Sequence, residues 1–130
     1  EYPNDQKMQS YVYNKQLSAL NYMETVQDRE VNTIALLEYP NDFAMQKYVY
    51  NKQLSAKGYM STVQDREVKG IAVREYPNDY SMQKYTFDKQ LSAKSYMNSV
   101  SNVGAKERAR QEYPYDYSMQ KYIYDQIVYG

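Results

Sequence analysis

The sequence predicts an all-α protein built from tandem helical hairpins that stack as an α-solenoid. Three observations lead to this prediction: a 37-residue internal repeat, apolar residues at helical spacing within each repeat, and a Pro-containing link where each repeat begins. The motif Glu-Tyr-Pro starts at Glu1, Glu38, Glu75 and Glu112. Repeats of this length cannot bury their apolar faces alone, so we expect them to stack on their neighbours.

The repeat divides the 130-residue chain into three and a half units, which we expect to form one repeat domain. The units are 1–37, 38–74 and 75–111, followed by the half unit 112–130. Units one and two are identical at 27 of 37 positions, whereas units two and three agree at only 2 of their last 11 positions. The second helix of the third unit is therefore divergent, as is typical of a terminal repeat.

Each full unit is expected to contain a long and a short helix, and the half unit one more long helix, making seven. In unit two the long helix covers 42–63, with Pro40 expected at a first helical position. Its apolar residues share one face, which we expect to be buried here and in unit three; they are Met45, Val49, Ala56, Met60 and Val63, then Met82, Ala93, Met97 and Val100. A narrower opposite stripe (Phe43, Tyr50, Leu54) indicates neighbours on both sides.

The short helix of unit two is expected from Arg66 to about Arg74, with Asp65 as its N-cap. The five-residue step from Val63 to Val68 breaks the helical phase and predicts a turn before Asp65. In unit three, Ala105 and Arg108 replace Val68 and Ile71, so that helix has a smaller and more charged inner face. We expect the half unit 112–130 to act as a C-terminal capping helix.

Composition excludes several classes of chemistry. Sixteen basic residues balance sixteen acidic ones, and Cys, His and Trp are absent. Disulfides, thiolate or imidazole metal sites and Cys or His catalysis are therefore excluded. The longest uninterrupted apolar run, 34–37, is four residues, so we expect no membrane span. No compartment is indicated.

Lysine and carboxylate residues offer the remaining candidates for chemistry. Lys15, Lys52 and Lys89 are expected near the centre of the apolar face, where a desolvated lysine could be a nucleophile. Recurrence in three units favours a structural role, because a catalytic group is needed only once. The acidic residues lack the spacing of a calcium loop. We therefore expect no catalytic residue, no metal site and no cofactor, and so a non-enzymatic protein.

Tyrosine is the most unusual component, with 18 residues at recurring positions. A tyrosine ring can anchor a protein partner, or it can replace Leu and Phe in a thin core, and both uses stay open here. We expect Tyr48 and Tyr59 inside, and Tyr39 and Tyr50 nearer the surface. The candidate partner-binding set consists of Tyr2, Tyr39, Tyr76, Tyr113, Tyr13, Tyr50, Phe87, Tyr124, Lys52 and Lys89.

The function expected from these patterns is a scaffold or linker that binds a protein partner through regularly spaced, Tyr-rich repeat surfaces. The alternative is a structural subunit of a larger assembly, ordered only against its neighbours, because Leu, Ile, Val and Phe are scarce. A nucleic-acid-binding helical repeat is less favoured. Its basic lining is missing, since Asp42, Asp65 and Glu67 interleave with the lysines and arginines.

Overall fold

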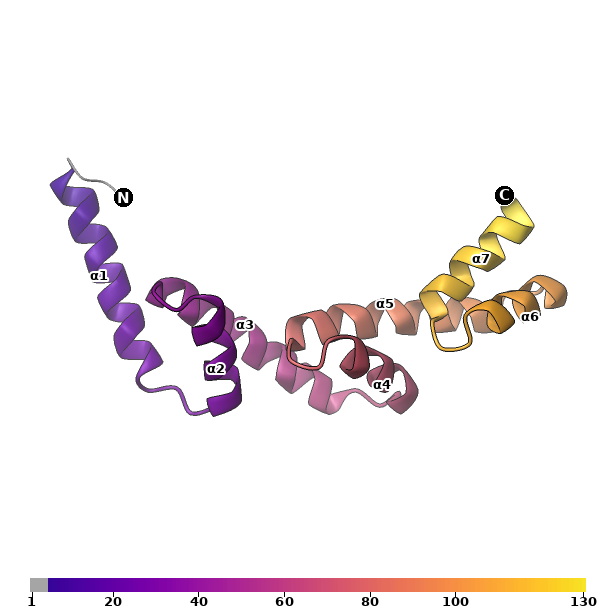
Figure 1. Cartoon of the computed structure of the whole chain (residues 1–130), viewed down its shortest axis with the longest axis horizontal. Helices are drawn as coiled ribbons and strands as arrows, with labels where there is room; N and C mark the ends of the chain where they lie inside the picture. Colours follow the sequence, from indigo (N-terminus) through magenta and orange to yellow (C-terminus); the bar gives the residue numbers. More distant parts are fainter. Residues whose placement is uncertain (1–4) are drawn as a thin grey trace. The chain divides into compact units, whose positions relative to one another are not determined.

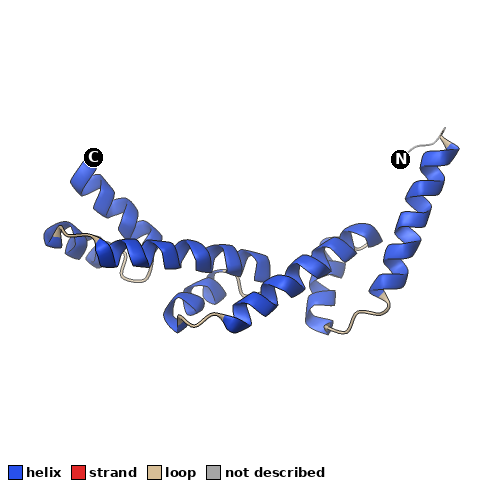
Figure 2. Cartoon of the chain, turned by 180° about the vertical axis from the view of Figure 1, so that it is seen from behind, coloured by secondary structure: helices blue, strands red, loops and turns tan. Residues whose placement is uncertain are grey.

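A computed structural model describes residues 5–130, and within that range the chain is helical with no strand (Figures 1 and 2). Long and short helices alternate, as the repeat predicts. The seven helices are α1 (Gln6–Met23), α2 (Arg29–Glu38), α3 (Phe43–Thr62), α4 (Arg66–Glu75), α5 (Tyr80–Ser99), α6 (Val103–Glu112) and α7 (Tyr117–Tyr129). The all-α prediction and its count of helices are confirmed. In residues 5–130, each helix is too short or too polar to span a membrane.

The helices begin where a short polar side chain can accept a backbone N–H. Asp65 accepts from Val68 N at 2.9 Å at the start of α4, and Asn102 accepts from Ala105 N at 3.0 Å at the start of α6. Asp42 accepts from Met45 N at 3.1 Å and so caps α3. Pro40 therefore lies in the turn before the cap, which corrects its expected place in the first helical turn. An Asp side chain at this position satisfies a free N–H group more directly than Pro can.

The turn predicted by the phase break is present. Residues 63–65 are non-helical and join α3 to α4, so the two helices are separate. The C-terminal end of each described short helix is a Tyr whose N–H donates to the carbonyl four residues earlier. This bond is 3.0 Å long from Tyr39, Tyr76 and Tyr113. The tyrosine of each of these Glu-Tyr-Pro links therefore makes the last backbone hydrogen bond of the short helix before it.

The chain forms two compact units, divided within α3 after Gly58. The first unit holds α1, α2 and most of α3. The second holds the end of α3 and all of α4, α5, α6 and α7. In the second unit, α5 packs against both α4 and α7, and α7 packs against α6.

The second unit has two apolar clusters, one under each short helix. Under α4, Met60 packs with Val68, Ala72 and Phe87. Under α6, the corresponding cluster consists of Met97, Ala105, Ala109 and Tyr124. In both clusters a methionine of a long helix packs against small or branched residues of the short helix that follows it. Methionine suits this place because its unbranched thioether fills irregular gaps.

The predicted inner face of the long helices is correct in part. Val49, Ala56, Met60, Ala93 and Met97 are buried, as expected. Four other residues of that face are only half-buried, namely Met45, Val63, Met82 and Val100. Their place in the interior is taken by glutamines, which hydropathy assigns to the surface: Gln46, Gln53, Gln83, Gln90 and Gln120. The buried face is therefore rotated toward the glutamine side of each helix.

Candidate functional site

The predicted partner-binding residues occupy three different environments. Tyr2 lies outside the described residues. Tyr39, Tyr76 and Tyr113 are half-buried at the ends of the short helices. Each of their carbonyls accepts a 2.7 Å hydrogen bond from a buried glutamine side chain seven residues on. These tyrosines are positioned by the link between helices, and their rings are only partly accessible.

The next group is buried. Tyr50 is 4% exposed, and Phe87 and Tyr124 are each 3% exposed. The expectation that Tyr50 lies nearer the surface is wrong. The hydroxyl groups of Tyr50 and Tyr124 accept the N–H of the N-cap residues Asp28 and Asn102 at 3.2 Å. This hydrogen bond explains how a tyrosine is tolerated in the interior, because its one polar atom has a partner.

The last group is exposed. Tyr13 is at the surface, and so are the lysines Lys52 and Lys89. The prediction that Lys15, Lys52 and Lys89 lie at the centre of a buried face is wrong. Because the buried face is rotated toward the glutamines, these lysines reach solvent. Lys52 lies 5.9 Å from the ring centre of Tyr48, one turn earlier on α3.

One recurring set of exposed tyrosines was missed by the reasoning from sequence. Their exposed fractions are similar, from 55% to 60%, and they occupy the same place in each repeat; these outer tyrosines are Tyr11, Tyr48, Tyr85 and Tyr122. Tyr48 was expected inside, so that prediction is wrong. Their 37-residue spacing was visible in the sequence, but their angle on the helix placed them at the edge of the supposed apolar face. The buried glutamines show which side of each long helix faces the interior, and therefore that these tyrosines face solvent.

Three further tyrosines link consecutive long helices. The hydroxyl of Tyr22 donates to Asn51 Oδ1 at 2.7 Å, that of Tyr59 donates to Asp88 Oδ1 at 2.6 Å, and that of Tyr96 donates to Asp125. A lysine ammonium covers each ring at 4.7 or 4.8 Å; these lysines are Lys47, Lys84 and Lys121. We call each such group a tyrosine clamp. The hydrogen bond to Asp125 raises the pKa of Tyr96 to about 12. Tyr59, expected inside, is half-buried.

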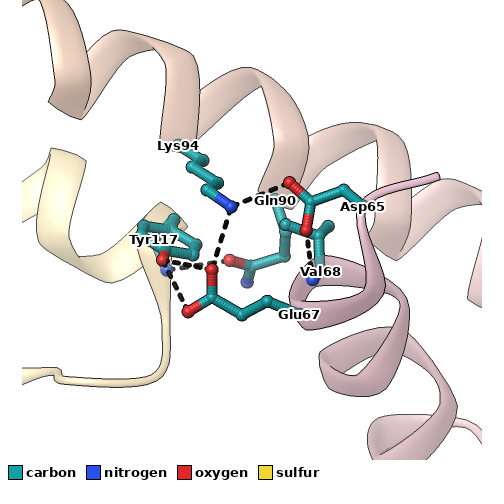
Figure 3. A network of polar contacts seen from close by, with 6 residues as sticks. All are labelled: Asp65, Glu67, Val68, Gln90, Lys94 and Tyr117. Carbon is teal, nitrogen blue, oxygen red and sulfur yellow. Dashed lines mark hydrogen bonds and ion pairs between the residues drawn. The ribbon is translucent and has the colours of Figure 1, made fainter.

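A polar network joins α4, α5 and α7 in the second unit (Figure 3). Lys94 of α5 lies between two carboxylates at the start of α4, with its Nζ 2.8 Å from Oδ2 of the N-cap residue Asp65 and 2.9 Å from Glu67 Oε1. The Tyr117 hydroxyl of α7 reaches both carboxylate oxygens of Glu67 at 2.7 Å. The Lys94 ammonium lies 5.7 Å from the Tyr117 ring centre. Four charged or polar groups from three helices thus share one network.

Gln90 extends this network to the start of α7. Its Nε2 donates to the cap residue Asp116 at 2.9 Å, and its Oε1 accepts the backbone N–H of Tyr117 at 2.8 Å. Gln16 makes the same two kinds of bond in the first unit, to Asp42 and Ala44. In both units, a glutamine of one long helix therefore supports the N-terminus of the following long helix.

The network shifts the pKa of Asp65, Glu67, Lys94 and Tyr117. The hydrogen bond from Lys94 lowers the pKa of the Asp65 and Glu67 carboxyl groups, and these carboxylates raise the pKa of Lys94. Burial, followed by the hydrogen bond to Glu67, raises the pKa of Tyr117. At neutral pH, all these shifts stabilise the charged carboxylates and ammonium and the neutral phenol, which are the forms that bind one another.

The first unit contains the same ionic group, with Lys57, Asp28 and Glu30 in the places of Lys94, Asp65 and Glu67. Lys57 Nζ lies 2.8 Å from Asp28 Oδ2 and 2.9 Å from Glu30 Oε1. The hydrogen bond from Lys57 lowers the pKa of Asp28. In both units the acidic residues follow the tight turn before a short helix. Their role is to hold that helix to the next long helix.

No protein-family model, curated protein or solved structure matches this chain. The geometry of the described residues is therefore the basis for a functional proposal. Among its recurring features are the outer tyrosines at the surface and several internal contacts.

Proposed function

We propose that this protein is a non-enzymatic helical-repeat scaffold that binds a protein partner through its outer tyrosines. The observation that carries the proposal is their uniform exposure of 55% to 60% at Tyr11, Tyr48, Tyr85 and Tyr122. A half-exposed tyrosine offers a large apolar ring and a hydroxyl, and it loses little side-chain entropy on binding. Repetition at one place in each repeat supplies the same contact several times.

The scaffold proposed here is an α-solenoid of 37-residue helical hairpins. Its support is that the same contacts recur one repeat apart, as in the three tyrosine clamps. The Lys57 and Lys94 ion pairs recur in the same way. In a solenoid each repeat contacts only its neighbours. Deletion of residues 38–74 should therefore leave a shorter, cooperatively folded helical protein, and loss of the helical circular dichroism signal in this variant would contradict the solenoid.

The partner-binding proposal is tested by removing outer tyrosines while keeping the fold. The test variant carries Tyr48→Ser, Tyr85→Ser and Tyr122→Ser. The control variant loses two exposed tyrosines that belong neither to the outer tyrosines nor to the predicted partner-binding set, through Tyr115→Ser and Tyr129→Ser. Affinity capture from a lysate of the cells that make this protein, followed by mass spectrometry, should recover a specific protein with the wild type and the control but not with the test variant. Equal recovery by the test variant would refute the role of the outer tyrosines.

A structural subunit that is ordered only against its neighbours is the second candidate. It is favoured by the large apolar side chains that stay exposed on the short helices, such as Leu37 at 79% and Val103 at 77%. Circular dichroism of the isolated chain separates the two functions. A helical signal that melts cooperatively supports the autonomous scaffold. A coil spectrum that becomes helical only with a partner supports the assembly subunit.

A further inference from the structure

Two small pockets with the same kind of lining occur in the two units. The pocket in the second unit lies between α5 and α7, has a volume of about 200 Å³, and is lined by Lys89, Ser92, Ala93, Ser118 and Lys121. The pocket in the first unit lies between α1 and α3, has a volume of about 180 Å³, and is lined by Lys15, Ser18, Ala19, Ala44 and Lys47. Each residue of one set is two repeats away from its counterpart in the other. We call these the lysine pockets.

The lysine pockets have no carboxylate in their lining. This distinguishes their lysines from Lys57 and Lys94, each of which lies within 3 Å of two carboxylate groups. Two ammonium groups that line one small pocket repel each other, and an anion between them would replace that repulsion with attraction. Each pocket thus has two lysines and no carboxylate in its lining.

One lysine of each pocket is held in place by a tyrosine clamp. The ammonium of Lys121 lies 4.8 Å from the ring centre of Tyr96, and that of Lys47 lies 4.7 Å from the ring centre of Tyr22. The clamp restricts a side chain that would otherwise be mobile. A restricted cation loses less entropy when it binds an anion, which favours binding.

A hydroxyl group distinguishes the second unit's pocket from the first. The Ser118 Oγ atom is buried and has no hydrogen-bond partner in the described chain. A buried hydroxyl without a partner is unfavourable, and rotation of the Ser118 side chain toward an oxygen acceptor bound in the pocket would relieve this cost. The first unit has Ala44 at the same position, which offers no such donor. The pocket of the second unit therefore has a side-chain hydrogen-bond donor, Ser118, that the pocket of the first unit lacks.

We propose that the lysine pockets bind a doubly charged oxyanion of the phosphate type, and that the second unit binds it more tightly. Two lysines match two negative charges, and the serine hydroxyls can donate to the remaining oxygen atoms. A singly charged carboxylate satisfies fewer of these groups. The phosphate group can come from free inorganic phosphate or from a phosphomonoester. This binding activity goes beyond the proposed scaffold function and does not depend on it.

The test is an NMR titration of the full chain with sodium phosphate, in which added sodium chloride keeps the ionic strength constant. The amide signals of Ser92, Ala93 and Ser118 should shift with saturation in the millimolar range, and those of Ser18 and Ala19 should saturate at higher concentration. Sodium acetate should produce smaller shifts. Absence of saturable shifts, or equal shifts with acetate, would overturn the proposal.

Matched variants identify the residues responsible. Lys89→Gln should weaken binding in the second unit by about threefold to fivefold, as expected for one exposed charge contact. Lys7→Gln removes the same charge from an exposed position outside both pockets and should leave the affinity unchanged. An equal loss in both variants would show a non-specific charge effect and would overturn the site.

The serine can be exchanged between the pockets. Ser118→Ala should reduce the affinity of the second unit to that of the first, and Ala44→Ser should raise the affinity of the first; no change in either pocket would refute the difference proposed between them. O-phosphoserine serves as the second probe. Binding at least as tight as that of inorganic phosphate supports a phosphomonoester ligand, and binding of inorganic phosphate alone supports the free ion.

Discussion

The short helices α4 and α6 have nearly the same geometry and very different side chains. Both contain ten residues, and their N-cap residues Asp65 and Asn102 have φ and ψ angles within 1° of each other. The α4 helix buries Val68, Ile71 and Ala72, and its first turn is paired with Lys94. The α6 helix buries only two alanines. Its inner face therefore lacks both branched side chains and the ionic group.

The comparison separates what specifies a short helix from what stabilises it. The cap bond at the start, the tyrosine bond at the end, and one fully buried alanine are common to both helices. These features fix the length and position of the helix. The branched residues and the ion pairs of α4 add stability to the same geometry. Stability can therefore differ along the chain while the structure stays the same.

The largest expected effect is the loss of stability when the methionine under either helix is truncated. We expect Met97→Ala to lower the free energy of unfolding by about 3 to 5 kcal/mol, and Met60→Ala by about 2 to 4 kcal/mol. Met97 faces Ala105 and Ala109, which are too small to fill the cavity that its truncation leaves. Urea unfolding of both variants measures the two costs. A larger cost for Met60→Ala would show that packing under α6 is not the limiting contact.

The second expected difference is in amide hydrogen exchange. Each branched residue absent from α6 removes about 1.5 to 3 kcal/mol of apolar burial. The opening free energy of α6 should therefore be lower than that of α4 by at least about 1.5 kcal/mol, which corresponds to exchange about tenfold faster or more. Residue-resolved exchange measured by NMR compares the two helices in one sample. Equal protection would indicate that another surface covers the charged face of α6.

The third expected difference is in pH dependence, because α4 has the lysine-paired carboxylates Asp65 and Glu67, whereas Asn102 and Gly104 take their places at α6. The folded-state pKa values of Asp65 and Glu67 lie below their unfolded values, so their contribution is present above about pH 4 and is lost as the pH falls through the folded values. The pKa of Lys94 is raised, so its contribution is present below about pH 10 and is lost as the pH rises through the folded value.

Acid should therefore destabilise α4 relative to α6, by on the order of 1 kcal/mol. Exchange of both helices at pH 7 and pH 3 measures this difference. Lys94→Met, which keeps most of the apolar stem, should remove the extra acid sensitivity of α4. If α4 keeps that sensitivity in the variant, the ion pairs are not its cause.

The smallest expected effect concerns a tyrosine hydroxyl that binds the N-cap residue of α2 and of α6 but is missing at α4. Tyr50 and Tyr124 each accept the N–H of an N-cap residue, whereas the repeat between them has Phe87, which cannot. We expect Phe87→Tyr to raise the stability of the chain by about 0.5 to 1 kcal/mol, through a new bond to Asp65 N. Tyr124→Phe should lower stability by a similar amount. A stability loss in Phe87→Tyr would show that the site has no room for the hydroxyl.

Much of the helical pattern was predictable because its signals are local. Asp65 and the phase break after Val63 act within a few residues and place the start of α4 correctly, whereas Pro40 was expected inside the long helix and lies before its cap. The orientation of the long helices was not predictable in the same way. The sequence offers Met45 as an apolar residue and Gln46 as a polar one, and the structure buries the glutamine. Gln46 is buried because its amide donates to the carbonyl of Tyr39.

The prediction of the partner-binding surface depended on the same question of which face of the long helix is buried. A rotation of the long helix by about one residue moves Tyr48 outward and Tyr50 inward, so the predicted set mixed buried rings with exposed ones. The spacing of 37 residues was certain from the sequence, and the side of the helix was not. A hydropathy scale counts a glutamine as polar and cannot register the carbonyl that satisfies it.

The sequence by itself determined the number of helices, their alternation in length, the caps of the short helices and the turns before them, because these depend on short-range hydrogen bonds and steric limits. Only the tertiary structure decided which face of each long helix is buried, which tyrosines reach solvent and which lysines are paired. The physical reason is that these outcomes depend on hydrogen-bond partners from other helices. Lys94, for example, is paired because Asp65 and Glu67 lie within 3 Å of it, and Lys89 lines a pocket without a carboxylate.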